Sequence, residues 1–169
     1  MRFAGQGSSR RSEKRSSRDP DDATTVMLQM TVTKENADAK EFVEAVKAWP
    51  VNGVAFTFYV PRKDERGGRF AWDDLRERDI AVRKIIELKK RYPIIKANVG
   101  ALERMLSDVS LESTGEHGET CNMKHMLPLY VGDGGTFERT FCCYGNDVDC
   151  SRCGAYAVFN SAFHRGEMA

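Results

Sequence analysis

The sequence predicts an α/β protein, a partial (β/α) barrel of about three βα units followed by a cysteine-rich β-hairpin and a helix. Between residues 23 and 110, strand-like apolar runs alternate with amphipathic stretches, as in parallel strands joined by helical crossovers. After residue 111 this alternation stops, and two short apolar runs flank a glycine-rich turn. Four of the five cysteines fall within residues 142–153, which indicates a separate chemical role for this end of the chain.

The chain has 169 residues, which is enough for one core with a small appended module. We divide it into three parts: a disordered, basic Ser/Arg-rich segment (1–22), a partial barrel (23–110) and a cysteine-rich metal-binding tail (111–169). The first segment has few large apolar residues, so it cannot bury enough surface to fold. An organelle transit peptide is the alternative for this segment, but its acidic residues argue against that.

The first βα unit spans residues 24–49. "TTVMLQMTVT" (24–33) alternates β-branched and other side chains, which predicts a strand that we expect to be buried on both faces. Apolar residues then recur at helical spacing from Ala39 to Trp49, and Thr33 or Asn36 is expected to cap this helix.

The second βα unit follows the same order. "GVAFTFYVP" (53–61) predicts an apolar strand, and the charged run "RKDERGGRF" (62–70) predicts a solvated connection. Asp73 is the expected cap of a long amphipathic helix that ends at Pro93.

A third, shorter unit completes the predicted barrel segment. "IIKA" (94–97) predicts a short strand, and Asn98 is placed to begin a third helix that continues through Val109. Three such units do not close a barrel, so this segment is expected to be part of something larger.

The C-terminal part predicts a hairpin that gathers cysteines. "MLPLYV" and "TFERTFCC" are strand-like, and "GDGG" between them supplies the positive-φ residues of a tight turn. Cys121 precedes the first run, while Cys142 and Cys143 end the second, so the hairpin is expected to bring them together. Residues 154–163 are expected to form a closing helix.

The candidate metal ligands are the five cysteines, namely Cys121, Cys142, Cys143, Cys150 and Cys153. Cys150 and Cys153 form a C-x-x-C pair, whose backbone can wrap one metal ion or one corner of a cluster. A four-coordinate site leaves one thiol over, and we prefer Cys142 to Cys143 as the fourth ligand. Four thiolates suit zinc and an iron–sulfur cluster equally well.

Other interpretations of the cysteines stay open. They can be packed core thiols or a redox-active group, since free cysteine is among the most buried residue types. His117 and His125 flank Cys121 and can substitute as ligands, although an isolated loop histidine is more often solvated.

Composition narrows the class of protein. The net charge is +1, which argues against binding nucleic acid mainly through phosphate neutralisation, so no nucleic-acid partner is expected. No apolar run approaches the roughly 20 residues of a membrane span. Clustered thiols without a secretory signal predict a reducing compartment, and hence a cytoplasmic location.

Four stretches carry a resemblance to a known family: "TTVMLQMTVTKEN", "VNGVAFTFYVPRKDE", "IKANVGALERML" and the tail "CCYGNDVDCSRCG". Over residues 24–165 the chain resembles the C-terminal portion of a radical S-adenosylmethionine (radical SAM) enzyme. The resemblance implies a partial barrel, with Gln29, Thr31 and Thr57 on strands that line the S-adenosylmethionine site. Structural hydrogen bonding is the simpler role for these three side chains.

The family's catalytic cluster loop, C-x-x-x-C-x-x-C, does not occur in this sequence. The resemblance therefore implies a truncated or split radical SAM protein that is not active alone. A second polypeptide would supply the N-terminal barrel half, and S-adenosylmethionine would bind only then. The tail would hold an auxiliary 4Fe-4S cluster or zinc. The alternative is a non-catalytic zinc-binding or protein-interaction module.

Overall fold

The computed structural model describes residues 25–123, 129–131, 134–135, 137–139 and 147–167, and it confirms the predicted mixed α/β class. Its elements, in chain order, are β1 (Met27–Val32), α1 (Ala39–Val46), β2 (Gly53–Phe58), α2 (Leu75–Arg91), α3 (Val99–Glu103), α4 (Ser110–Thr114), β3 (Leu129–Val131), β4 (Phe137–Arg139), the 3-10 turn η1 (Cys150–Arg152) and α6 (Tyr156–Glu167). The segment 1–22, predicted to be disordered, lies outside the described residues.

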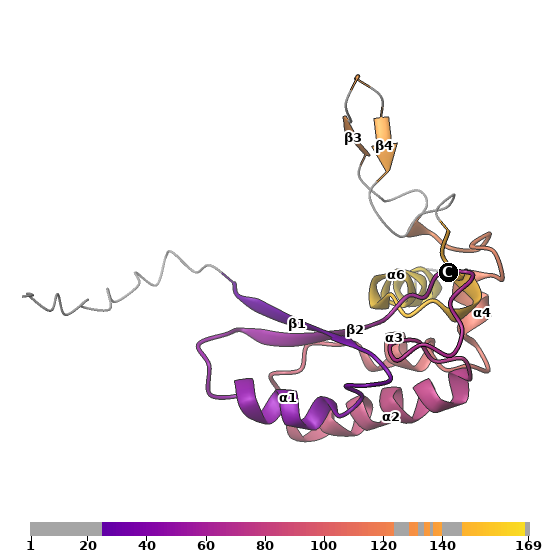
Figure 1. Ribbon diagram of the computed structural model, residues 1–169. Coiled ribbons are helices and arrows are strands. Elements are labelled where there is room, and N and C mark those ends of the chain that lie inside the picture. Colours follow the sequence, from indigo (N-terminus) through magenta and orange to yellow (C-terminus); the bar gives the residue numbers. More distant parts are fainter. Residues whose placement is uncertain (1–24, 124–128, 132–133, 136, 140–146, 168–169) are drawn as a thin grey trace, which may run out of the picture.

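The first two strands form a parallel sheet with α1 as the crossover between them. The register runs from Met27 opposite Gly53 to Val32 opposite Phe58. Helices α1 and α2 lie below this sheet in Figure 1. The described residues thus contain the predicted order of parallel strand, helix and parallel strand.

The predicted third strand is reduced to a single bridge. Val54 donates its N–H to the Ile94 carbonyl at 2.8 Å and accepts from the Lys96 N–H at 2.9 Å, which places Ile95 parallel to β2. The chain turns into α3 three residues later, so the ladder does not extend.

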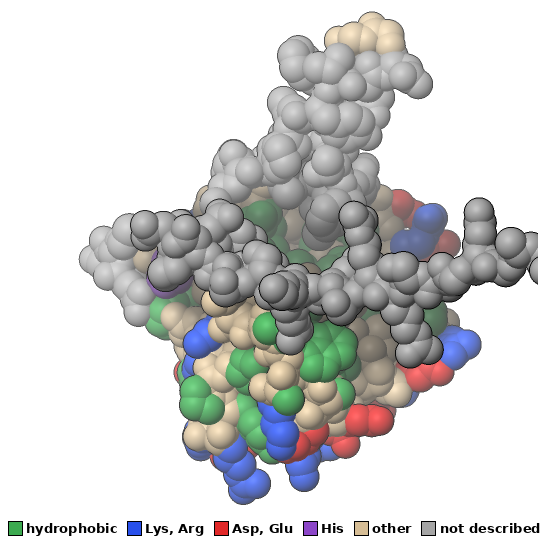
Figure 2. Space-filling model, turned by 90° about the vertical axis from the view of Figure 1, so that its left-hand side faces the viewer, with side chains coloured by type: hydrophobic (Ala, Val, Ile, Leu, Met, Phe, Trp, Pro, Cys, Tyr) green, Lys and Arg blue, Asp and Glu red, His purple; other side chains and the backbone are tan. Residues whose placement is uncertain are grey.

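The expectation that β1 is buried on both faces is wrong. Val32 is fully buried on the face that α1 and α2 cover, whereas Met27 is 44% exposed and Gln29 and Thr31 are exposed on the other face. The reason is that α6 covers only the carboxyl end of β2, where the Tyr156 N–H donates to the Thr57 hydroxyl. Figure 2 shows apolar side chains on the face of the molecule seen from the left of Figure 1.

The core lies between the covered face of the sheet, α1, α2 and the segments that follow α2. Phe56 and Phe58 from β2 and Phe159 from α6 are its fully buried aromatic residues, each at most 1% exposed, and Trp72 joins them at 5%. The aliphatic members include Val43, Val82, Ile85, Ile95, Leu102 and Met105. Because Phe159 joins this cluster, the C-terminal helix belongs to the same core as the strands.

The cap of α1 differs from the prediction. Asp38 accepts the N–H of Lys40 at 3.0 Å and begins the helix. Asn36 instead accepts the N–H of Thr33 at 2.6 Å and donates to the Thr31 carbonyl, so its side chain closes the turn after β1. The two residues predicted as caps are therefore used by the turn that precedes the helix.

The cap of α2 is displaced by one residue, from Asp73 to Asp74, which accepts the N–H of Arg76 at 2.9 Å. Asp73 accepts the N–H of Gly67 at 2.7 Å and is used inside the preceding loop.

Helix α1 ends at Val46, earlier than the predicted end at Trp49, and leaves Trp49 55% exposed beyond it.

The third helix begins at the predicted cap, since Asn98 accepts the N–H of Gly100 at 2.9 Å. It does not run through Val109, because α3 ends at Glu103 and α4 begins at Ser110. Asp79 of α2 explains the interruption. Its carboxylate accepts both the N–H and the hydroxyl of Ser107, at 3.0 and 2.6 Å, which holds the chain in a turn between the two helices.

The C-terminal hairpin and helix occur close to their predicted positions. β3 and β4 pair antiparallel, with Leu129 opposite Arg139. Gly134 and Gly135 in the connecting turn have φ of 88° and 78°, as the "GDGG" motif predicts. The closing helix begins at Tyr156 rather than residue 154.

Candidate metal centre

The C-x-x-C pair lies on a tight turn that the local sequence specifies. Asp149 caps η1 by accepting the N–H of Ser151 at 3.1 Å. The N–H of Cys153 then donates to the Cys150 carbonyl at 3.1 Å. The two cysteines are thus fixed at the two ends of one 3-10 turn.

Arg152 anchors this turn to the loop that follows β2. Its guanidinium donates to Asp149 at 2.8 Å, to Asp73 at 3.3 Å, and to the backbone carbonyls of Arg62 and Glu65 at 3.2 and 2.7 Å. The side chain is only 7% exposed. The loop over residues 62–70, predicted to be a solvated connection, is therefore held against the cysteine turn.

The backbone reinforces the same junction. The N–H of Asp149 donates to the Pro61 carbonyl at 2.8 Å, and Arg62 forms an antiparallel bridge with Val148. The N–H of Phe58 donates to the Gly154 carbonyl at 2.7 Å. The cysteine turn consequently lies beyond the carboxyl end of β2, where parallel sheets commonly place their sites.

The neighbours of Asp149 stabilise its ionised carboxylate. Burial raises the pKa of its carboxyl, but hydrogen bonds from Ser151 and Arg152, with the nearby charges of Arg152 and Arg66, outweigh burial and leave the pKa lowered. Asp149 is thus an ionised acceptor at neutral pH, and its role is to orient the turn.

Cys121 and Cys150 lie within electrostatic reach of each other, although they are 29 positions apart in the sequence. Both are half-buried. Burial raises the pKa of the Cys150 thiol, and the charges of Cys121, Asp149 and Glu119 raise it further, against a smaller opposing effect of Lys63. The raised pKa favours the protonated Cys150 thiol, and a bound metal would displace its proton.

Cys153 has a different environment. It is 6% exposed and packs into the hydrophobic core, and its carbonyl accepts from Arg78 Nη1 at 2.6 Å. Arg78 is 1% exposed and also donates to the Met105 carbonyl. Among the described residues its Nε atom has no hydrogen-bond partner.

Arg78 therefore places a buried positive charge beside the cysteine turn. Burial lowers the pKa of its guanidinium, whereas the charges of Asp79 and Cys153 raise it. A guanidinium stays protonated even when buried. A positive charge here favours anionic sulfur, which a metal–thiolate centre contains.

The other predicted site residues divide into two groups. Cys142, Cys143 and His125 lie outside the described residues. His117 is exposed, and its backbone N–H donates to the Glu119 carboxylate at 2.8 Å. Within the part of the chain that the structure describes, no three His, Cys, Asp or Glu side chains converge as a metal site. The described residues therefore supply three cysteines, Cys121, Cys150 and Cys153, toward a thiolate centre.

The polar strand residues Gln29, Thr31 and Thr57 lie on the same face of the sheet. Thr31 is in register with Thr57, and Gln29 with Ala55. Gln29 and Thr31 are exposed. The Thr57 hydroxyl donates to the Gly154 carbonyl at 3.4 Å and accepts the Tyr156 N–H at 3.2 Å, so it has a structural role.

Two site residues escaped prediction, although the sequence contained a signal for each. Arg78 stands at helical spacing between Leu75, Val82 and Ile85 and so falls on the buried stripe of α2. Arg152 lies within the C-x-x-C motif itself. A charged residue on a buried stripe indicates a specific partner, because charged residues are rarely buried unpaired.

Comparison with known proteins gave no match: the chain matches no family model, no curated protein and no solved structure. Across the described helices, none combines the length and the apolar character that crossing a membrane requires.

Proposed function

We propose that this chain binds a metal centre through its C-terminal cysteines, as the iron–sulfur-bearing part of a radical SAM-type enzyme whose radical-generating half is another polypeptide. The observation that carries the proposal is that Cys121 packs against the same core cluster that contains Cys153. Cys121 also acts electrostatically on Cys150, so cysteines from distant parts of the sequence share one region. Cys142 or Cys143 and Cys153 are the proposed remaining ligands. Thiolates are the ligands of both iron–sulfur clusters and structural zinc.

The residues around the thiols have distinct parts in this proposal. Asp149 and Arg152 fix the turn that presents Cys150, so that little conformational entropy is lost on binding. Arg78 supplies a positive charge that offsets the negative charge of the thiolates. When bound, an auxiliary 4Fe-4S cluster would supply a one-electron carrier.

The need for a second polypeptide rests on the open side of the sheet. Met27, Gln29 and Thr31 leave one face of β1 exposed, whereas on the opposite face Leu28 and Met30 are partly buried and Val32 is fully buried. Parallel sheets are normally covered on both faces. Additional parallel strands from a partner would continue the sheet from β1 and cover this face as the inside of a barrel.

Anaerobic reconstitution with iron and sulfide tests the metal proposal. The expected product is a brown protein with broad absorption in the blue and bound iron and sulfide in equal amounts. Cys121→Ser and Cys150→Ser are each expected to abolish the colour, whereas Ala155→Ser, which adds a hydroxyl near the turn and removes no sulfur, retains it. Unchanged iron content in both cysteine variants would contradict the proposal.

A zinc-binding module is the second candidate function, and the short turn between Cys150 and Cys153 together with the β3–β4 hairpin favours it. Such a combination is typical of ribbon-like structural zinc sites. Purification without added metal, followed by elemental analysis, distinguishes the two functions. A colourless protein with one zinc per chain would support the zinc module and exclude the iron–sulfur centre.

A further inference from the structure

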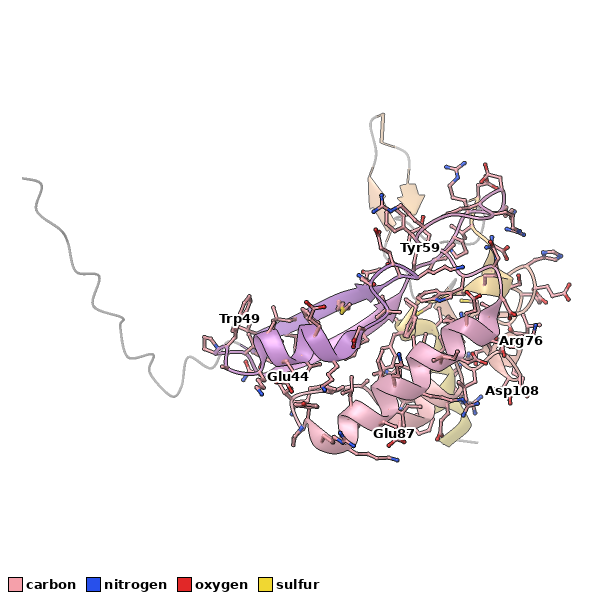
Figure 3. All side chains as sticks on the ribbon, turned by 60° about the horizontal axis from the view of Figure 1, so that its bottom comes forward. Glu44, Trp49, Tyr59, Arg76, Glu87 and Asp108 are labelled. Atoms are coloured by element: carbon pink, nitrogen blue, oxygen red, sulfur yellow. The ribbon has the colours of Figure 1, made fainter. Side chains whose placement is uncertain are left out.

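A groove runs between the N-terminus of α1 and the outer face of α2, with a volume of about 570 Å³. Figure 3 shows the two helices side by side with their side chains. The α2 residues that line it are Ile80, Arg83, Lys84, Glu87, Leu88 and Arg91. Their spacing of three and four positions places them on one stripe of the helix. The groove is therefore a continuous surface along about three turns, or about 16 Å, of α2.

The floor of this groove is apolar. Ile80 is 60% exposed, which makes it the most exposed large hydrophobic residue in the described part of the chain. Leu88, two turns further along α2, is half-buried beside it. An isolated exposed isoleucine is ordinary, but one in a groove with a second apolar residue provides an anchor site for an apolar side chain.

The rim of the groove is basic. Four exposed cations line it: Lys40 of α1 and Arg83, Lys84 and Arg91 of α2. Within the described residues none of the four makes a salt bridge, although many of the other surface cations do. Lys40 interacts electrostatically with Glu44, but without a salt bridge. A basic rim whose side chains form no salt bridges is a surface complementary to negative charge.

The two carboxylates in the groove do not neutralise this rim. Asp38 accepts the Lys40 backbone N–H as the cap of α1, and Glu87 pairs with Lys90 at 2.7 Å. The basic side chains thus outnumber the acidic ones by two to one, and one of the two carboxylates is paired with a lysine.

We propose that this groove binds an acidic amphipathic segment of a partner protein, with apolar side chains on Ile80 and Leu88 and carboxylates on the basic rim. The apolar floor favours a peptide over a nucleic acid, whose recognition is mainly phosphate contact. The chain's own residues 1–22 are not the occupant proposed, because their composition is basic. The inference is independent of the cysteines, since the groove lies on α1 and α2.

The test is titration of the full chain with a fluorescent 14-residue helix-forming peptide of Leu and Glu, followed by anisotropy. We expect saturable binding that weakens as salt is raised, because salt screens exposed charges. The double variant Arg83→Glu/Lys84→Glu and, separately, Ile80→Glu are each expected to weaken binding about tenfold or more. Both sites are exposed, so the variants are expected to fold.

The control is Arg165→Glu on α6, a single charge reversal at an exposed position outside the groove, which is expected to bind the peptide as the wild type does. A peptide with Lys in place of Glu is expected not to bind. The proposal is overturned if the groove variants bind like the control. It is also overturned if phosphatidylserine vesicles or duplex DNA bind in preference to the peptide, or if Ile80→Glu dissociates a dimer of this chain.

Discussion

At the scale of single residues, two buried arginines, Arg78 and Arg152, hold the cysteine turn. Arg152 pairs with the carboxylates of Asp149 and Asp73, whereas Arg78 donates only to backbone carbonyls. The planar guanidinium fork allows one side chain to satisfy several acceptors at fixed angles. Replacement of either arginine would remove several hydrogen bonds at once.

Arg152→Lys is expected to destabilise the protein by about 2 kcal/mol, because an ammonium group cannot reach all four acceptors. Urea unfolding followed by circular dichroism measures the change. Arg66→Lys is the control, since Arg66 contacts the same Asp149 from the surface, and its effect is expected to be below about 0.5 kcal/mol. Equal losses in the two variants would show that burial of Arg152 is unimportant.

The lowered pKa of Asp149 makes part of the stability depend on pH. Since the folded pKa lies below the unfolded value of about 3.9, the stabilisation is complete above that value and is lost as the pH falls through the folded pKa. The difference in unfolding free energy between the wild type and Asp149→Asn is therefore expected to shrink in acid. Unfolding curves between about pH 7 and about pH 2 measure it, and a difference independent of pH would refute this role.

At the scale of elements, close backbone contact holds the C-terminal segment on the sheet. Gly154 lies so near β2 that a Cβ atom there would come within 2.6 Å of Phe58 Cβ and of the Tyr59 carbonyl oxygen. Gly100 of α3 has the same relation to the ring of Phe163 in α6. Glycine at these two positions therefore determines how closely two pairs of segments pack.

Gly154→Ala is expected to cost about 1–3 kcal/mol, because the clash involves the backbone of β2, which cannot move aside cheaply. Thermal unfolding gives the change. Gly68→Ala serves as the comparison, since its Cβ would meet only the flexible end of Glu65 at 3.1 Å. A similar melting temperature for both variants would mean that the segment can shift away from β2.

Periodicity was enough to locate the parallel strands, α1, α2, the hairpin and α6, because each has its own local pattern. It failed at the helix between Asn98 and Val109. There the periodicity is helical, but Asp79, a residue 28 positions earlier, binds Ser107 and interrupts the helix. Local propensity contains no information about a competing acceptor from another helix.

The candidate site was less accessible from sequence than the fold. The C-x-x-C spacing identified Cys150 and Cys153, but it could not show that Cys153 packs into the core while Cys150 lies near Cys121. Burial of a thiol depends on tertiary packing, which has no periodic signal. The exposure of Gln29 on the open sheet face was missed for the same reason.

At the scale of the whole molecule, the tail and the strands share one core. Phe159 and Val158 of α6 pack with the residues of β2, and α6 also contacts α3 and α4. The C-terminal segment in addition accepts the Phe58 N–H. The folding unit thus includes both ends of the described chain.

A chain that ends at residue 110 is therefore expected to lose cooperative unfolding, because Phe56, Phe58 and Arg78 would be left uncovered. Calorimetry and amide hydrogen exchange provide the measurement. Deletion of residues 1–22 instead is expected to leave the melting temperature unchanged, since the sequence predicts disorder there. A cooperative transition in the shortened chain would show that the strands form a domain of their own.

The bond between Thr57 and Gly154 spans 97 positions of the chain, and this has a consequence during synthesis. At about 5–20 residues per second, β2 is synthesised roughly 5 to 20 s before its partner segment. For that interval β2 lacks the part of its cover that the C-terminal segment provides, including Gly154 and Phe159. Nascent chains are then exposed to chaperones and proteases, so codons that slow translation between these positions would be expected to lower the yield of protein in the cell.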